Sequence, residues 1–180
     1  MKGIAGTAGL IFLAAMAGCG GDSNPIIPQQ PRYLPSSTPH NVLENVRRAY
    51  TRRDSTAYDS LFDAAYIGTS IDNTDPSPTL LTFTKADESL HIRALARSTS
   101  IATVYLSFGS NTVRFTDVAD TLGWATVQVP NPLLQISDAT VDWFISGSET
   151  MEFKFRPTTP SAGSQTDTTW HVVRWTEIAN

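Results

Sequence analysis

The chain has 180 residues, of which 41% are hydrophobic and 17% charged, and its formal net charge at pH 7 is −4. This length and composition suit one folded domain with an adequate hydrophobic core. The mildly acidic balance gives no indication of a nucleic-acid-binding protein, which concentrates basic side chains on one surface.

The N-terminus has the pattern of a bacterial lipoprotein signal peptide. Lys2 precedes an apolar run from Ile4 to Ala17, and Gly18 leads to Cys19, the only cysteine of the chain. We therefore predict a signal peptide over residues 1–18 and a lipid such as palmitate on Cys19. A transmembrane anchor is an alternative, but the run is shorter than the ~20 residues that cross a bilayer. An ordinary secretory signal and an unpaired core thiol at Cys19 are two further interpretations.

A tether is predicted after the lipidation site. Residues 19–37 are rich in glycine, serine, proline and glutamine, and this composition buries too little apolar area to fold. We expect a lipidated, disordered tether over residues 19–37, extended at ~3 Å per residue, and a single domain over residues 38–180. The expected location is the bacterial cell envelope, with the domain attached to a membrane through lipid and facing the periplasm or the exterior.

Helices are predicted at the start of the domain. Thr38 can cap a helix that has Pro39 at its first position, and apolar residues recur at three- and four-residue spacing over residues 42–50. Four arginines lie late in this segment: Arg47, Arg48, Arg52 and Arg53. We expect them to face solvent and to stabilise the helix dipole, with a phosphate or lipid-headgroup patch as the alternative.

A second and a third helix are predicted next. Asp54 can cap a helix with an apolar stripe over residues 57–65, which Gly68 would end. After a loop and a short extended run over residues 79–83, Thr84 and Asp87 approximate a capping box for the third helix.

The rest of the chain is predicted to form a sheet. Runs rich in aromatic and β-branched residues are separated by turn residues: 101–108, 113–118, 124–129, 141–145, 151–156 and 170–178. The run 151–156 alternates apolar and charged residues, which predicts one buried and one solvated face. Gly109, Gly123 and Gly147 are candidate positions for bulges or bends of the sheet.

Three segments of the domain, taken together, resemble a known superfamily. They are the helix start Pro39-His40-Asn41-Val42-Leu43, the Arg53-Asp54 cap, and the closing strand Trp170-His171-Val172-Val173-Arg174-Trp175. With a third helix between them, they resemble the nuclear transport factor 2-like superfamily, which includes SnoaL-like and cystatin-like cone proteins. The resemblance spans residues 38–180. It implies an α+β fold in which N-terminal helices pack in a strongly curved antiparallel sheet and leave a pocket.

Large aromatic side chains are the candidates for the pocket or the core of this fold. They are Tyr58, Trp143, Phe153, Phe155, Trp170 and Trp175. An aromatic side chain buries ~150–250 Å², so packing against the helices is the first expectation for those in strands and ligand contact the second.

Some members of the superfamily are enzymes, similar to ketosteroid isomerase, scytalone dehydratase and polyketide cyclases. These use an acid or a histidine with a tyrosine or a second acid, and a general base needs a partly desolvated site. The candidates here are Asp117, Asp120, Asp142, Glu152 and His171, with Tyr50, Tyr58 or Tyr105 as donors. None lies in a motif that matches such an enzyme, and strand alternation points Asp142 and Glu152 toward solvent. No catalytic residue is therefore assigned.

Metal and cofactor sites are not predicted. His40, His91 and His171 are isolated in the sequence, and Asp72, Asn73 and Asp75 lack the further ligands of a calcium loop. The sequence has no Gly-rich phosphate loop and no Gly-x-Ser-x-Gly elbow. A cofactor, nucleotide use and serine hydrolase chemistry are accordingly not expected.

Two function classes remain. The first is a membrane-anchored lipoprotein whose non-catalytic domain binds a small apolar ligand or another envelope protein. The second is an isomerase- or dehydratase-like enzyme that uses the cone pocket. A buried acid or histidine that lies in an enclosed cavity beside a tyrosine would favour the enzyme. Self-association through the sheet, which would give a homo-oligomer, is a third and separate hypothesis.

Overall fold

The computed structural model describes residues 31–72, 77–119, 121, 123–145, 149–158 and 168–179. The predicted signal peptide, Cys19 and residues 19–30 of the predicted tether lie outside these ranges. Within them the chain forms three helices and nine strands: α1 Pro39–Thr51, α2 Ser55–Ser60, β1 Phe62–Asp72, β2 Leu80–Thr84, α3 Lys85–Arg97, β3 Ile101–Ser107, β4 Val113–Phe115, β5 Ala125–Pro130, β6 Leu133–Asp138, β7 Asp142–Ile145, β8 Thr150–Thr158 and β9 Thr169–Ala179. None of these helices is long and apolar enough to cross a membrane.

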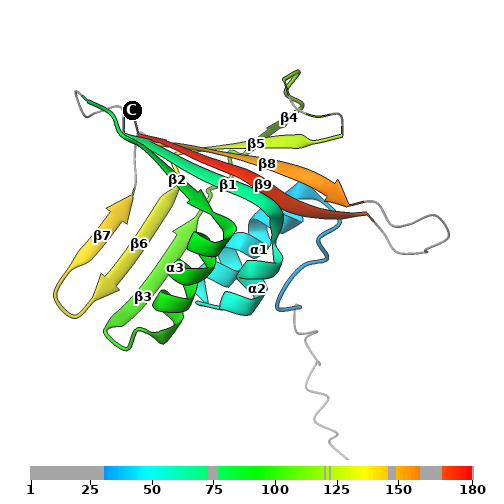
Figure 1. Ribbon diagram of the computed structural model, residues 1–180. Coiled ribbons are helices and arrows are strands. Elements are labelled where there is room, and N and C mark those ends of the chain that lie inside the picture. The colour runs from blue at the N-terminus through cyan, green and yellow to red at the C-terminus, as the bar shows by residue number, and fades with distance from the viewer. Residues whose placement is uncertain are drawn as a thin grey trace, which may run out of the picture. The chain divides into compact units, whose positions relative to one another are not determined.

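Two sheets enclose the helices. The larger has the strand order β2-β1-β9-β8-β5-β4 and the smaller has the order β3-β6-β7. Figure 1 shows the helices on one side of the long sheet, with the smaller sheet flanking them. This is the predicted α+β architecture. One pair, β1 with β9, is parallel rather than antiparallel. Parallel pairing needs a long crossover, and nearly the whole domain lies between these two strands.

The larger sheet bends at bulges that contain no glycine. The register shifts between Phe62 and Ile67 in β1 and between Lys154 and Phe155 in β8. Gly109 and Gly123 instead have positive φ angles, of 63° and 89°, in turns outside the strands. Gly147 lies outside the described residues. The shifts in register come from extra residues in the ladder, which increase the local twist, and not from Gly109 or Gly123.

The predicted cap of α1 is confirmed. The Thr38 hydroxyl oxygen accepts a hydrogen bond from the Asn41 amide at 3.1 Å, and Pro39 is the first helical residue. The apolar stripe of this helix is buried: Val42, Leu43, Val46, Ala49 and Tyr50. This burial anchors α1 to the concave side of the sheet.

The junction between α1 and α2 is tight because one residue adopts a left-handed conformation. Arg53 has a φ of 53°, and the amides of Arg53 and Asp54 donate back to the carbonyls of Tyr50 and Ala49. This pattern of reversed hydrogen bonds closes a helix C-terminus. Asp54 then accepts from the Ala57 amide at 3.1 Å and starts α2, as predicted.

The second helix is shorter than predicted. It ends at Ser60, and Phe62 begins β1, so the predicted stripe to Ala65 and the stop at Gly68 were wrong. The sequence pattern of residues 57–65 suits either structure. Pairing of β1 with both β2 and β9 decides for a strand, because tertiary contacts override weak helix propensity.

The other predicted elements are confirmed, with one further omission. The capping box of α3 is present, the run 79–83 corresponds to β2, and the six later runs correspond to β3, β4, β5, β7, β8 and β9. β6 was not predicted. It follows the turn Pro130-Asn131-Pro132, and prolines this close to a run argue against a strand in sequence reasoning.

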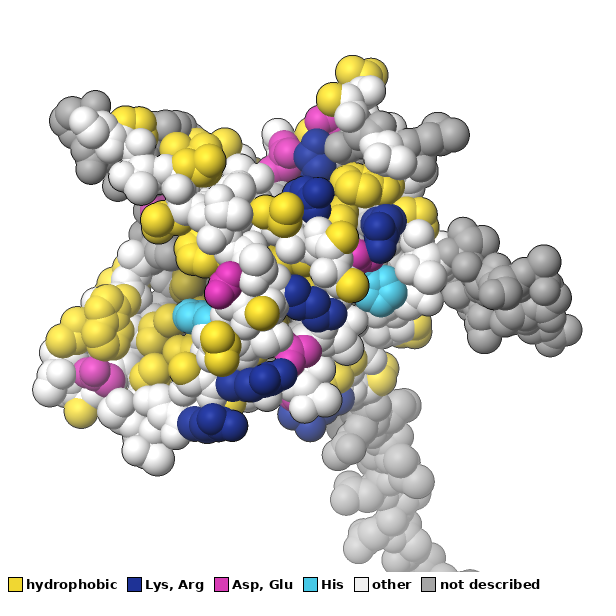
Figure 2. Space-filling model, in the orientation of Figure 1, with side chains coloured by type: hydrophobic (Ala, Val, Ile, Leu, Met, Phe, Trp, Pro, Cys, Tyr) yellow, Lys and Arg dark blue, Asp and Glu magenta, His cyan; other side chains and the backbone are white. Residues whose placement is uncertain are grey.

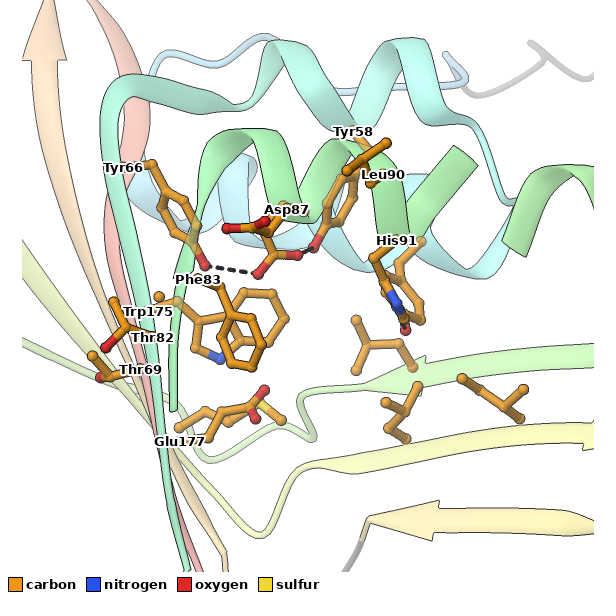
Figure 3. A pocket seen from close by; sticks show the side chains of 17 residues that line it. Tyr58, Tyr66, Thr69, Thr82, Phe83, Asp87, Leu90, His91, Trp175 and Glu177 are labelled. Carbon is orange, nitrogen blue, oxygen red and sulfur yellow. Dashed lines mark hydrogen bonds between the residues drawn. The ribbon is translucent and has the colours of Figure 1, made fainter. Parts of the chain in front are cut away.

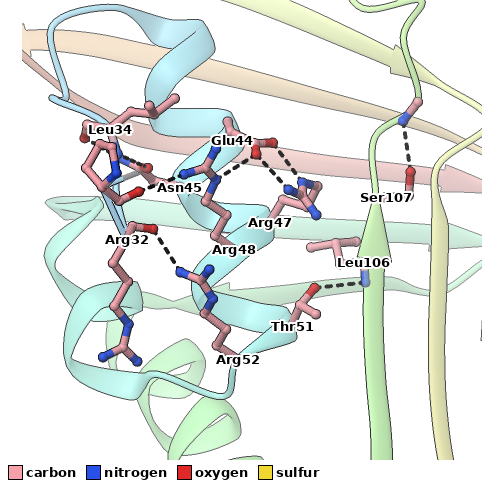
Figure 4. A network of polar contacts seen from close by, with 12 residues as sticks. Arg32, Leu34, Glu44, Asn45, Arg47, Arg48, Thr51, Arg52, Leu106 and Ser107 are labelled. Atoms are coloured by element: carbon pink, nitrogen blue, oxygen red, sulfur yellow. Dashed lines mark hydrogen bonds and ion pairs between the residues drawn. The ribbon is translucent and has the colours of Figure 1, made fainter. Parts of the chain in front are cut away.

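Residues 31–37 belong to the folded unit, which begins at Pro31 and not at the predicted boundary. Asn45 is buried, and its side chain accepts from the Leu34 amide and donates to the Leu34 carbonyl, both at 2.8 Å. Ser36 accepts from the Trp170 amide at 2.8 Å. Figure 4 shows this segment beside α1. The end of the predicted tether is therefore held by the domain, because its backbone groups find partners there.

The arginines at the end of α1 and just after it make structural contacts. Arg47 and Arg48 both donate to Glu44, at 2.6–2.7 Å, and this pairing lowers the pKa of Glu44 to about 2. Arg52 donates to the Arg32 carbonyl at 2.8 Å (Figure 4). Arg53 donates to the Ile101 carbonyl at 3.0 Å. These partners favour a structural role over an anion-binding patch. The expectation that all four arginines face solvent was wrong, because only Arg52 is exposed.

Candidate functional site

A cavity of about 640 Å³ lies between the helices and the two sheets. All three helices and strands β1, β2, β3, β6, β8 and β9 contribute to its walls. The size falls in the range of small-molecule sites, which are mostly apolar with a few polar groups. Figure 3 shows these polar groups converging from α3, β1 and β9.

Glu88 on α3 is held by two tyrosines. The Tyr66 hydroxyl donates to Oε1 at 3.0 Å, and the Tyr58 hydroxyl donates to Oε2 at 3.3 Å (Figure 3). Burial raises the pKa of Glu88, and the two tyrosine hydrogen bonds partly offset this rise. Both carboxylate oxygens are thus engaged, which fixes the side chain in one orientation.

Gly68 on β1 lets Tyr66 reach Glu88. The two residues lie on the same face of the strand, two positions apart, and a Cβ at position 68 would lie 2.5 Å from the Tyr66 hydroxyl oxygen. Any other residue would push the ring aside. Gly68, which the sequence pattern predicted as a helix stop, therefore gives Tyr66 the space to reach Glu88 in the pocket.

Glu177 on β9 is the second pocket carboxylate. Burial, together with the charges of Glu88 and Glu149, raises its pKa to about 7, while a hydrogen bond from Ser70 acts in the opposite direction. At neutral pH this group is therefore divided between its acid and its carboxylate forms. A pKa near the working pH is the condition under which a side chain best takes up and returns protons.

His91 and Tyr50 form a third polar pair. The Tyr50 hydroxyl lies 2.7 Å from His91 Nε2. Burial lowers the pKa of His91, so the imidazole is neutral at pH 7 and its nitrogen can accept the tyrosine O–H. Burial also raises the pKa of Tyr50. The pair is therefore uncharged.

The remaining walls are mostly apolar, with Thr69 and Thr82 as further polar residues, and the charged groups have one sign. Apolar wall residues come from both sheets and from α3: Phe83, Leu90, Leu106, Leu134, Ile136 and Met151. The wall residues, all within the described part of the chain, include Asp87, Glu88 and Glu177 but neither lysine nor arginine. Like charges repel at short range in a partly dry site, so the cavity disfavours anions.

The structure of this domain is similar to solved structures, whereas its sequence is not matched by a known family or a curated protein. No family model and no curated protein matches the chain. A nuclear transport factor 2-like protein of unknown function in nutrient uptake from Rhodospirillum rubrum is 15% identical, with a TM-score of 0.51, over 77% of this chain and 95% of that one. The domain has the nuclear transport factor 2-like fold. A candidate scytalone dehydratase from Novosphingobium aromaticivorans has the same TM-score at 9% identity, over 77% of this chain and 78% of that one.

The nuclear transport factor 2-like cone divides the six predicted aromatic residues among three environments. Tyr58 and Trp175 line the pocket. Phe153 and Phe155 are fully buried in the core behind it, and Trp170 is half-buried against that core. Trp143 is 50% exposed on β7, where Figure 2 shows hydrophobic side chains gathered over the smaller sheet. Cys19 lies outside the described residues.

The predicted acids and the histidine that the structure describes do not line the cone pocket. Asp117 pairs with Lys154 at 3.0 Å, Glu152 accepts from Gln128 at 3.2 Å, and Asp142 is exposed. His171 lies 3.4 Å from the Thr158 hydroxyl. Of the predicted donors, Tyr50 and Tyr58 line the pocket, whereas Tyr105 is 41% exposed. Asp120 lies outside the described residues.

The sequence patterns did not identify Glu88, Tyr66 or Glu177 as pocket residues, although one of the three stands in a usable pattern. Glu88 follows Asp87 in the first turn of α3, where acidic residues are ordinary, and Tyr66 lay in a predicted helix. Glu177, however, stands two residues after Trp175 in β9, and strand alternation places both on one face. An acid on the buried face of a strand was the pattern that could have identified the site.

Metal binding has no support within the described residues. No three histidine, cysteine, aspartate or glutamate side chains among them are grouped so that they could hold a metal ion. Asp72 ends β1, while Asn73 and Asp75 lie outside the described ranges.

Proposed function

We propose that the cone pocket binds a small, uncharged and mainly apolar molecule and that Glu177 transfers a proton on it. The observation that carries this proposal is the Glu177 carboxyl group in a cavity walled by aromatic and aliphatic side chains, where burial raises its pKa to about 7. Sequence reasoning favoured a binding domain without catalysis. A buried acid beside two tyrosines, Glu88, with a second acid, Glu177, in the same cavity, favours the alternative, an isomerase- or dehydratase-like enzyme.

The two carboxylates have different tasks in this proposal. Glu88 is fixed by Tyr58 and Tyr66 and serves as a rigid polar wall. Glu177 accepts a hydrogen bond from the Ser70 side chain and changes its protonation state during the reaction. In its ionised form it accepts a proton from carbon beside a carbonyl group. In its protonated form it returns that proton at another position, which isomerises the molecule, or helps expel a hydroxyl group, which dehydrates it.

Binding without turnover is the second candidate function. It is favoured by the engagement of the other titratable pocket groups, because Glu88 is held by two tyrosines and His91 lies against Tyr50. Asp87 also lines the pocket and accepts from Thr84, so Glu177 would be the pocket carboxylate left for proton transfer. A carrier of the same uncharged molecule would need the same apolar walls.

Deuterium uptake separates the two candidates without knowledge of the natural substrate. The full chain is incubated in D₂O with a panel of uncharged cyclic ketones, and exchange at the carbon beside the carbonyl is followed by NMR. We expect exchange that the Glu177→Gln variant slows about 100-fold or more. Glu152→Gln is the matched control, because Glu152 lies on β8 outside the pocket.

The outcomes are distinct. Exchange that is equal in wild-type protein and Glu177→Gln would overturn the catalytic proposal. Binding of the ketones, measured by thermal shift, without any exchange would support the carrier instead. If the chain neither binds the ketones nor catalyses exchange, both candidate functions are wrong.

We further propose that Cys19 carries the lipid that attaches this domain to a membrane of the cell envelope. The proposal rests on the sequence pattern before Cys19, the only cysteine. In a bacterial host, radiolabelled palmitate is expected to label the wild-type chain and not Cys19→Ser, and the variant is expected to leave the membrane fraction. An unlabelled wild-type chain would contradict the anchor and the envelope location.

A further inference from the structure

One buried polar group in the pocket wall has no partner within the described structure. The side chain of Trp175 is 7% exposed, and its indole Nε1 is a buried donor without a hydrogen bond. A buried donor left unsatisfied destabilises the folded state, because it has lost its hydrogen bond to water without replacement. Such groups are uncommon and call for an explanation.

The position of this donor points to a ligand. Trp175 lines the cavity, and Figure 3 shows its nitrogen directed into the pocket, on the side where Glu177 lies. The Trp175 ring also packs in the core, because its centroid lies 4.8 Å from the centroid of the Phe153 ring. The indole is thus held in place by the core while its N–H is turned toward the cavity.

The donor and the proposed proton-transfer group stand on the same face of β9. Trp175 and Glu177 are two residues apart, so their Cα atoms are separated by about 7 Å along the strand. An oxygen bound at Trp175 would place the neighbouring carbon atoms of the same molecule within reach of the Glu177 carboxylate. The spacing suits a carbonyl oxygen and a carbon one or two bonds from it.

The charge of the pocket decides which acceptor fits. A carboxylate or a phosphate would also accept from an indole N–H, but Glu88 and Glu177 would repel it. A hydrocarbon would leave the N–H unsatisfied. An uncharged ketone meets both conditions, and its apolar body matches the aliphatic wall formed by β3 and β6.

We propose that the Trp175 indole N–H donates a hydrogen bond to a carbonyl oxygen of the ligand, so that the pocket selects uncharged cyclic ketones over hydrocarbons of the same shape. Trp175 is in this sense a specificity-determining residue. The inference rests on the proposed function for the role of Glu177, but the contact itself requires no turnover.

The test uses 1-tetralone and tetralin, which differ by one oxygen. The indole N–H resonances of the ¹⁵N-labelled full chain are recorded with each compound, and the Trp175 resonance is assigned by its loss in Trp175→Phe. We expect 1-tetralone, and not tetralin, to move the Trp175 proton downfield. No shift, or equal shifts with both compounds, would overturn the proposal.

Affinity gives a second and independent measurement. In wild-type protein we expect 1-tetralone to bind about tenfold more tightly than tetralin. This ratio of dissociation constants corresponds to the net contribution of one hydrogen bond. Trp175→Phe should abolish this preference, whereas the matched variant Trp170→Phe, on a half-buried residue outside the pocket, should keep it. An equal loss of affinity for both compounds in Trp175→Phe would show a packing defect and contradict the hydrogen bond.

Failure of this inference can be told apart from failure of the proposed function. Deuterium uptake that depends on Glu177, without a shift of the Trp175 resonance, would support proton transfer by Glu177 and contradict the hydrogen bond from Trp175 to the carbonyl oxygen. A shift of that resonance without deuterium uptake would leave the contact and remove the catalysis.

Discussion

A Phe153→Ala variant is expected to lose about 3–5 kcal/mol of the free energy of unfolding. Phe153 is fully buried on β8. The centroid of its ring lies 4.8 Å from the ring centroid of Trp175, 5.3 Å from that of Phe108 and 6.4 Å from that of Phe155. Removal of the ring leaves a cavity that these rigid neighbours cannot fill. Urea unfolding followed by circular dichroism measures the loss.

Trp143→Ala is the matched control for this experiment. Trp143 belongs to the same set of predicted aromatic residues, but it is 50% exposed on β7, so its loss should change the free energy by no more than about 0.5 kcal/mol. If Phe153→Ala is too unstable to measure, Phe153→Leu is expected to show a smaller loss in the same direction. Equal losses at positions 153 and 143 would contradict this description of the core.

A Glu177→Gln variant is expected to be more stable than the wild-type chain above pH 7. The folded domain raises the pKa of Glu177 from 4.5 to about 7, so the folded state binds this proton more tightly than the unfolded chain does. Between pH 4.5 and 7 the contribution of Glu177 to the stability of the wild-type chain therefore falls as the pH rises. The glutamine side chain of the variant is neutral at every pH and avoids this loss.

The size of the effect follows from the shift. One pKa unit corresponds to about 1.36 kcal/mol, and after allowance for solvent screening the gain at pH 8 should be about 1–3 kcal/mol, with little difference at pH 4.5. Glu88 and Glu149 both raise the pKa of Glu177 and remain in the variant. Urea unfolding at several pH values gives the comparison, with Glu152→Gln as control. A difference that does not depend on pH would show that Glu177 is not perturbed by burial.

Local sequence patterns predicted the helix starts because capping is a local interaction. Thr38, Asp54 and Thr84 each accept hydrogen bonds from amides three residues ahead, so the residues that decide the cap lie within one turn of the helix. The alternation of residues 151–156 predicted β8 for the same reason, since the pleat of a strand needs only its own side chains to define two faces.

Two strands required tertiary contacts. β1 follows a helical pattern in sequence and becomes a strand because β2 and β9 pair with both of its edges. β6 lies next to a turn with two prolines and is stabilised by pairing with β3 and β7. β2 and β7 are near neighbours in the chain, but β9 and β3 lie far from the strands they pair with, so no local pattern contains them.

The sequence alone determined the single α+β domain, the caps of its helices, most of its strands and the N-terminal lipoprotein pattern, because each of these depends on neighbouring residues. Only the tertiary structure decided the pocket. It brings Glu88 of α3 beside Tyr58 and Tyr66, and it places Glu177 and Trp175 against the same cavity. The pKa of a carboxylate and the satisfaction of an indole N–H depend on burial and on partners from distant segments, and these exist only after the helices have packed against the sheets.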